Sequence, residues 1–200
     1  MNNSISQFRE NIHRARHLGG LYSALESLTT ELIDSSDILR SQIVLSVSAL
    51  DHYVHEVTVE GMLEVYKGNR QPTNSYLKYQ VSTSSLMLAK TTMNMESIFE
   101  EEIRQKHSYL SFQYPDKVAD AIRLFSGCKL WEEVGVILNL SARDTKDKLK
   151  LIVDRRNKIA HEADIDPSYP GMRWPITVND ANQATDFIEQ LCESIHSIVF

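Results

Sequence analysis

The sequence predicts an all-α protein: a helical bundle with a long central helix and a C-terminal helix that closes it. Apolar residues recur at intervals of three and four through most of the chain, which is the spacing of helices with one buried face. Only 7 of the 200 residues are glycine and 5 are proline, so long segments run uninterrupted. No repeat and no domain-separating linker occurs. We therefore expect a single domain over residues 1–200, with residues 1–35 as a helical extension packed on it.

The N-terminal extension shows two helical segments. Phe8, Ile12 and Ala15 follow helical spacing in the first segment, and Gly19-Gly20 allow a break after it. The apolar positions of the second segment are Leu21, Leu25, Leu28 and Leu32. The first twenty residues are polar and carry several charges, so they do not form a signal peptide.

The longest helix is predicted from about Ile38 to Tyr66. Ser35-Ser36-Asp37 supply N-cap chemistry before it, and residues 67–72, which include a glycine and a proline, end it. Its apolar positions are Ile43, Val44, Val47, Leu50 and Val54. A helix this apolar is usually the central one of a bundle, and its most apolar stretch is much too short to span a bilayer.

The segment that follows is less regular. Its pattern is compatible with an extended stretch at residues 76–81 and with the start of a helix at residues 86–92. A further helix is predicted at residues 93–106. Its buried stripe is expected to consist of Met95, Ile98, Phe99 and Ile103.

Two shorter helices are predicted next. Tyr114-Pro115-Asp116 interrupts the chain, and Gly127 separates the first short helix from a second at about residues 130–140. The apolar positions of the first are Val118, Ala121, Ile122 and Phe125.

The last two helices are amphipathic. Residues 141–144 resemble a capping box that opens the penultimate helix, and its apolar stripe is Leu149, Ile152, Val153, Ile159 and Ala160. Residues 163–175 hold three prolines and a glycine and are expected to form a loop. Thr177 and Asn179 are candidate caps for the closing helix. The inward positions of that helix are Ala184, Phe187, Ile188, Leu191 and Ile195.

The bulk composition excludes several classes of protein. A net charge of -6 argues against a general nucleic-acid coat protein, although it allows a local basic site. Cys128 and Cys192 lack metal-type spacing, and two reduced thiols are favoured over a disulfide between them. The 7 glycines form no phosphate-binding loop, so we expect no ATP hydrolysis and no cofactor. With no signal peptide or membrane span, we expect a cytoplasmic protein.

The penultimate helix is basic within an acidic protein. Residues 143–161 contain seven basic and three acidic side chains, a local charge of +4. Such a segment fits an anion-binding stripe. It also fits a solvated helix face with pairs such as Asp144 and Lys148, and charge alone favours this second interpretation.

The end of this helix carries residues that can handle a phosphodiester without a metal ion. The hexapeptide is Arg156-Asn157-Lys158-Ile159-Ala160-His161. Asn157 and His161 are four positions apart and lie on one face, whereas Arg156 borders the apolar stripe and is expected to face another helix or subunit. An arginine can hold phosphate oxygens through its planar fork, and a histidine in the last helical turn can carry a proton near neutral pH. The spacing of Arg156 and His161 alone is structural more often than functional.

The hexapeptide resembles the Arg-Asn-x-x-Ala-His signature of the HEPN superfamily (higher eukaryotes and prokaryotes nucleotide-binding). The predicted helical bundle, with the motif at the end of its penultimate helix and a proline-rich loop after it, is similar to that superfamily. The stretch Ser48-Ala49-Leu50-Asp51-His52-Tyr53-Val54-His55-Glu56 is similar to the RiboL-PSP subgroup, in which an acidic residue lies in the middle of a helix. The resemblance extends over about residues 36–200.

The resemblance implies a metal-independent endoribonuclease that acts as a homodimer with a composite active site. Arg156 would stabilise charge on the phosphorus, and His161 would act as general base or acid while the ribose 2′-hydroxyl attacks the adjacent phosphate. Asn157 would orient the histidine or hydrogen-bond the phosphate. The products would carry 2′,3′-cyclic phosphate and 5′-hydroxyl ends, and DNA would not be cut.

Other residues are candidates for supporting roles. Asp51 is expected either to pair with Arg156 or His161 across the core, or to face solvent as an ordinary helix carboxylate. Lys158, Arg155 and Lys150 are expected to bind RNA electrostatically.

Two pairs of side chains have weaker interpretations. His52 and His55 lack the spacing of a metal pair and are expected at the surface or at an interface, so no metal site is predicted. Tyr169 and Trp174 in the loop fit either a role in stacking on a base or a role as hydrophobic anchors.

Three hypotheses remain from the sequence. The leading one is an HEPN ribonuclease in a toxin or phage-defence setting, with RNA as substrate and an antitoxin or regulatory protein as a further partner. The second is a non-catalytic HEPN module that binds RNA or a partner protein, which the pI near 5.6 favours. In the third, Arg156 and His161 hold together a dimer of a helical interaction domain.

Overall fold

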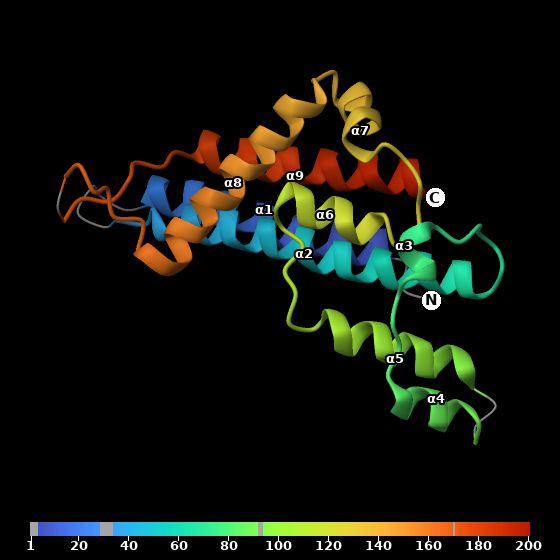
Figure 1. Cartoon of the computed structure of the whole chain (residues 1–200). Helices are drawn as coiled ribbons and strands as arrows, with labels where there is room; N and C mark the ends of the chain where they lie inside the picture. The colour runs from blue at the N-terminus through green and yellow to red at the C-terminus, as the bar shows by residue number, and fades with distance from the viewer. Residues whose placement is uncertain (1–3, 29–33, 92–93, 170) are drawn as a thin grey trace.

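The computed structural model describes residues 4–28, 34–91, 94–169 and 171–200, and this part of the chain is built of helices (Figure 1). An isolated bridge between Ile165 and Arg173 is its one β-type pairing. The helices are α1 (Ser4–Leu28), α2 (Asp37–Tyr66), α3 (Asn74–Leu77), α4 (Thr83–Ala89), α5 (Met95–His107), α6 (Pro115–Ile122), α7 (Leu130–Leu138), α8 (Ala142–Glu162) and α9 (Val178–Val199). The predicted all-α bundle is confirmed.

The central helix of the bundle is α2. It packs against α1 and α9, which also pack against each other, and α8 crosses these helices obliquely (Figure 1). Leu50 and Tyr53 of α2 are fully buried, and the Phe8 ring of α1 lies 5.4 Å from the Tyr53 ring. Burial of an apolar side chain such as Leu50 or Phe8 contributes ~1.5–3 kcal/mol. The long apolar stripe of α2 therefore holds α1, α8 and α9 in place.

The first helix is continuous, so the predicted break at Gly19-Gly20 is wrong. A Cβ atom at Gly19 would lie 2.7 Å from Gln42 Oε1 and 3.2 Å from Asn182 Oδ1. The glycine thus allows α1 to approach the polar contact between α2 and α9. The second predicted stripe is also wrong, because Leu21 and Leu28 are exposed. Leu32 lies outside the described residues.

Ser141 and Thr177 cap their helices, as predicted from their residue types. The Ser141 hydroxyl accepts a hydrogen bond from Asp144 N at 3.0 Å at the start of α8, and Thr177 with Asp180 forms a capping box at α9. Asn179 is therefore not a cap. Ser36 makes no side-chain cap at α2. The carboxylate of Asp34 instead accepts a hydrogen bond from Ser36 N at 3.0 Å.

The segment between α2 and α6 forms a lobe in which α4 packs on α5 and α5 packs on α2 (Figure 1). Residues 76–81 do not form one extended stretch, because α3 continues to Leu77 and Lys78 also has a helical backbone conformation. The predicted stripe of α5 is only partly buried: Ile103 is fully buried, whereas Met95 is 42% exposed. Met93, where this helix was expected to begin, lies outside the described residues.

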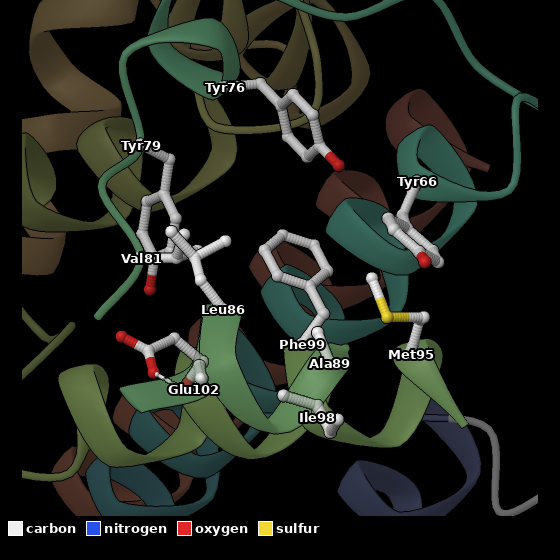
Figure 2. A pocket seen from close by; sticks show the side chains of 11 residues that line it. Tyr66, Tyr76, Tyr79, Val81, Leu86, Ala89, Met95, Ile98, Phe99 and Glu102 are labelled. Atoms are coloured by element: carbon white, nitrogen blue, oxygen red, sulfur yellow. Dashed lines mark hydrogen bonds between the residues drawn. The ribbon is translucent and has the colours of Figure 1, made fainter. Parts of the chain in front are cut away.

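A partly open apolar pocket of about 240 Å³ lies between the lobe and the end of α2 (Figure 2). Tyr66, Tyr76 and Phe99 supply aromatic walls. The carboxylate of Glu102 accepts hydrogen bonds at one end, from Ser82 N and Ser82 Oγ at 2.8 Å each. This pocket is separate from the clefts beside α8 described below, with which it shares no lining residue.

The cysteines are both unpaired, with Cys192 buried and Cys128 half-buried. None of the helices in the described ranges combines the length and the hydrophobicity needed to cross a bilayer.

Candidate functional site

The hexapeptide lies where α8 leaves the bundle. Leu149 and Val153 are fully buried, and positions 156 and 160 continue the same helical stripe. Arg156 is half-buried and Ala160 is exposed. The helix ends immediately afterwards, because Ala163 (φ 50°) and Asp164 (φ 58°) take the left-handed conformation. The last turn of the basic helix is therefore accessible from outside the bundle.

Arg156 and Asn157 are connected to a tyrosine from a different part of the chain. Arg156 Nη1 donates to Asn157 Oδ1 at 2.9 Å, and Asn157 Nδ2 donates to Tyr114 Oη at 3.0 Å. Tyr114 in turn donates to Asp154 Oδ1 at 2.8 Å. This hydrogen bond raises the pKa of the Tyr114 hydroxyl, which therefore stays protonated at neutral pH. Within one chain Asn157 holds Arg156. The role toward the histidine or the phosphate that the resemblance implies for Asn157 stays a prediction.

His161 is exposed one turn beyond Asn157. Among the described residues, no hydrogen bond or ion pair involves its imidazole. On a helix, a step of five residues separates side chains by about 140°, so Arg156 and His161 point in divergent directions. One chain thus presents the two groups separately.

Open clefts lie on both sides of Asn157. One has a volume of about 650 Å³ and lies between Arg156 and the segment that joins α5 to α6. The other, of about 560 Å³, is bordered by Lys158 and Trp174. Tyr114 borders both clefts, which makes it part of the wall between them.

Asp51 does not pair with Arg156 or His161 and does not simply face solvent. Its Oδ1 accepts a hydrogen bond from Phe112 N at 2.6 Å, and its Oδ2 accepts one from Gln113 Nε2 at 2.8 Å. Phe112 and Gln113 are the two residues before Tyr114. The predicted supporting acid therefore anchors the segment that carries Tyr114 and affects the hexapeptide indirectly.

Arg155 has a structural role besides the RNA contact predicted for it, which stays a prediction. Its Nη2 lies 2.8 Å from Asp164 Oδ2, the same oxygen that Arg40 Nε approaches at 2.8 Å. Both arginines also donate to the carbonyl oxygen of Trp174. Burial lowers the pKa of Arg155, although a guanidinium remains charged in proteins. This ion cluster ties the loop after α8 to α2 and α8.

The other predicted contact residues are more accessible. Lys150 is exposed, and Lys158 Nζ lies 5.1 Å from the centre of the Trp174 ring. Trp174 is half-buried and anchors the loop, whereas Tyr169 is 67% exposed. Lys158 and Lys150 thus stay predicted RNA-binding residues on α8.

Sequence reasoning missed Tyr114, Arg40 and Asp164. Tyr114 precedes a helix-starting proline and Arg40 lies in the first turns of α2, so neither has a local signal of its role. Asp164 follows a helix that ends without a glycine, and this is only a weak sequence signal of a special role. His52 and His55 belong to no group of three or more metal-type ligands in the described residues. His55 Nε2 lies 3.8 Å from Asp51 Oδ1.

An all-α bundle with a long apolar central helix, and with Arg156, Asn157 and His161 at the exposed end of the penultimate helix, has the architecture of an HEPN domain. The RiboL-PSP-HEPN family matches residues 9–199, and the chain belongs to that family. No curated protein and no solved structure matches it.

Proposed function

We propose that the chain is an endoribonuclease that cleaves RNA without a metal ion. The observation that carries the proposal is the state of the motif side chains. Arg156 is held by Asn157 beside an open cleft, and His161 is exposed and unengaged one turn further on. A guanidinium can stabilise the charge that develops on a phosphoryl group, and an imidazole can transfer the proton that transesterification requires.

In the proposed reaction Arg156 binds the non-bridging phosphate oxygens. Its orientation is set in advance by Asn157, so little reorganisation is needed as charge develops on the phosphorus. His161 takes the proton from the ribose 2′-hydroxyl or gives one to the departing 5′-oxygen. The 2′-oxygen bonds to phosphorus as the bond to the 5′-oxygen breaks, leaving 2′,3′-cyclic phosphate and 5′-hydroxyl ends. DNA has no 2′-hydroxyl and is not a substrate.

A homodimer would complete the site, because Arg156 and His161 diverge within one chain. The end of α8 supports this part of the proposal. Ala160 continues the buried stripe onto the surface, and Leu45 of α2 is 44% exposed beside a groove that Ile159 also lines. A second copy covering this apolar edge would bring its own motif close to that of the first chain.

The first experiment is cleavage of labelled RNA in excess EDTA. We expect the wild type to cut RNA but not DNA of the same sequence and to leave cyclic phosphate ends. His161→Ala should abolish cutting while the thermal midpoint stays unchanged, since His161 has no partner in the described structure. Arg156→Lys should also reduce cutting strongly, because lysine lacks the two-pronged contact. Equal cutting by wild type and His161→Ala would disprove the assigned role.

A non-catalytic module that binds RNA or a partner protein is the second candidate. The net charge of -6 favours the form of this module that binds a partner protein, because repulsion by the acidic body weakens RNA binding. Absence of cutting together with retained binding would identify this alternative. The toxin or phage-defence setting, with an antitoxin or regulatory protein as partner, is proposed on the family alone.

A further inference from the structure

We propose that Tyr114 is a positioning residue that sets the orientation of the Arg156 guanidinium through Asn157. The inference rests on the proposed ribonuclease function in that Arg156 is taken as the phosphate-binding group. Tyr114 lies 42 positions before Arg156 in the sequence. In the described residues its side chain hydrogen-bonds to neither Arg156 nor His161. Its effect would be exerted through the amide of Asn157.

The direction of each hydrogen bond follows from the chemistry of the groups. An ionised carboxylate can only accept, so the single hydroxyl proton of Tyr114 is donated to Asp154 Oδ1, 2.8 Å away. Tyr114 Oη can then only accept from Asn157. The asparagine must therefore turn its NH₂ group toward the tyrosine, at 3.0 Å. Its carbonyl oxygen is left facing Arg156 Nη1, which donates to it at 2.9 Å.

The direction of these hydrogen bonds matters because an asparagine side chain can present either its carbonyl oxygen or its NH₂ group to a neighbour. Without the tyrosine hydroxyl, the amide of Asn157 can rotate and offer its NH₂ group to Arg156, which also has only donors. Two donors cannot hydrogen-bond each other. The Arg156 guanidinium would then sample several rotamers, and the preorganised phosphate contact would be lost for part of the time.

Tyr114 is itself held firmly enough to act as a fixed reference point. Asp51 binds the backbone of Phe112 and the side chain of Gln113 just before it. Pro115, directly after it, is buried and begins α6. Contacts with α2 and α6 thus fix the position of the Tyr114 hydroxyl, which hydrogen-bonds to side chains of α8. Asp51 supports Arg156 by way of this segment.

The test compares single and double variants in steady-state RNA cleavage. We expect Tyr114→Phe to lower kcat about tenfold, or ~1.4 kcal/mol in activation free energy, with little change in KM. Asn157→Ala should lower kcat by at least as much. The double variant Tyr114→Phe/Asn157→Ala should be no slower than Asn157→Ala, because both changes remove the same chain of hydrogen bonds. Multiplied effects in the double variant would overturn the proposal, as would a Tyr114→Phe enzyme with wild-type kcat.

Tyr22→Phe is the matched control. Tyr22 also donates its hydroxyl to a carboxylate, that of Glu26 at 3.0 Å, but this contact lies within α1, and in the part of the chain that the structure describes no hydrogen bond joins it to the hexapeptide. The control should retain wild-type kcat and KM. Thermal unfolding of both variants separates a positioning effect from loss of the fold, since the midpoint of Tyr114→Phe is expected within a few degrees of that of the wild type.

A second readout does not depend on catalysis. In an NMR spectrum of ¹⁵N-labelled protein, Tyr114→Phe should shift the side-chain amide signals of Asn157 and the Nε–H signal of Arg156, whereas Tyr22→Phe should leave both unchanged. Absence of cleavage by the wild type would refute the ribonuclease proposal, and the NMR shifts would still decide the hydrogen-bond chain. Unshifted Asn157 and Arg156 signals in Tyr114→Phe would refute the positioning role even if the wild type cuts RNA.

Discussion

Asp164→Ala should destabilise the protein strongly, because Arg40 and Arg155 both pair with the Asp164 carboxylate. The Asp164 side chain is fully buried, and those of Arg40 and Arg155 are 7% and 25% exposed. Its removal leaves two neighbouring guanidinium groups without the carboxylate that they share, and among the ion pairs of the described residues Arg40 keeps only the longer 3.8 Å approach to Asp37. Loss of one partner from a buried ion cluster costs about 3–5 kcal/mol. For a chain of this size the thermal midpoint should fall by roughly 10 °C.

Urea denaturation followed by circular dichroism would measure the change in unfolding free energy. Asp147→Ala is the matched control, since Asp147 pairs with Arg143 at 3.5 Å on the exposed surface of α8. An exposed pair contributes about 0–1 kcal/mol, so the control should differ little from the wild type. If Asp164→Ala lost less than ~1 kcal/mol, or no more than the control, the structural role assigned to the ion cluster would be refuted.

Three further predictions concern pH, assembly and RNA binding. Burial lowers the pKa of His107 to about 4, so between pH 6.5 and 4 the unfolded chain binds a proton that the folded chain does not. The unfolding free energy should therefore fall as pH drops through this window, by up to ~1.4 kcal/mol per pH unit, and His107→Leu should flatten the pH profile measured by denaturation. Leu45→Glu should convert the proposed dimer to monomers in sedimentation and abolish RNA cleavage, whereas Val136→Glu, at an 82% exposed position of α7, should do neither. Lys158→Ala should weaken binding of non-cleavable 2′-O-methyl RNA and reduce the salt slope by about 1, as measured by fluorescence anisotropy; an unchanged slope would remove Lys158 from the interface.

The helical bundle was predictable because helix formation here is dominated by local periodicity. The stripe of α2 is long, apolar and uninterrupted, and its bounds were predicted to within a residue. The serine and threonine caps of α8 and α9 are likewise local contacts over three residues. The family resemblance carried by the hexapeptide is also a local feature, and the family match over residues 9–199 supports it.

The errors arose where a distant residue changed the meaning of a local signal. Gly19 was expected to break a helix, yet it lies within α1. Its lack of a side chain allows α2 and α9 to approach closely there. Arg155 was expected to bind RNA electrostatically, yet it pairs with the buried carboxylate of Asp164 and donates to the carbonyl oxygens of Trp174 and Pro175. In both cases the residue type was compatible with two roles, and packing decided between them.

The sequence by itself determined the fold class, the order of the main helices and the residues of the motif, because each depends on neighbours within one or two helical turns. Only the tertiary structure decided what orients the motif. Tyr114 reaches Asn157 across 43 positions, and Asp51 holds the segment before that tyrosine from 61 positions away. Such hydrogen bonds depend on distance and angle within a few tenths of an ångström. That geometry is set only after the helices have packed, and no spacing along the chain encodes it.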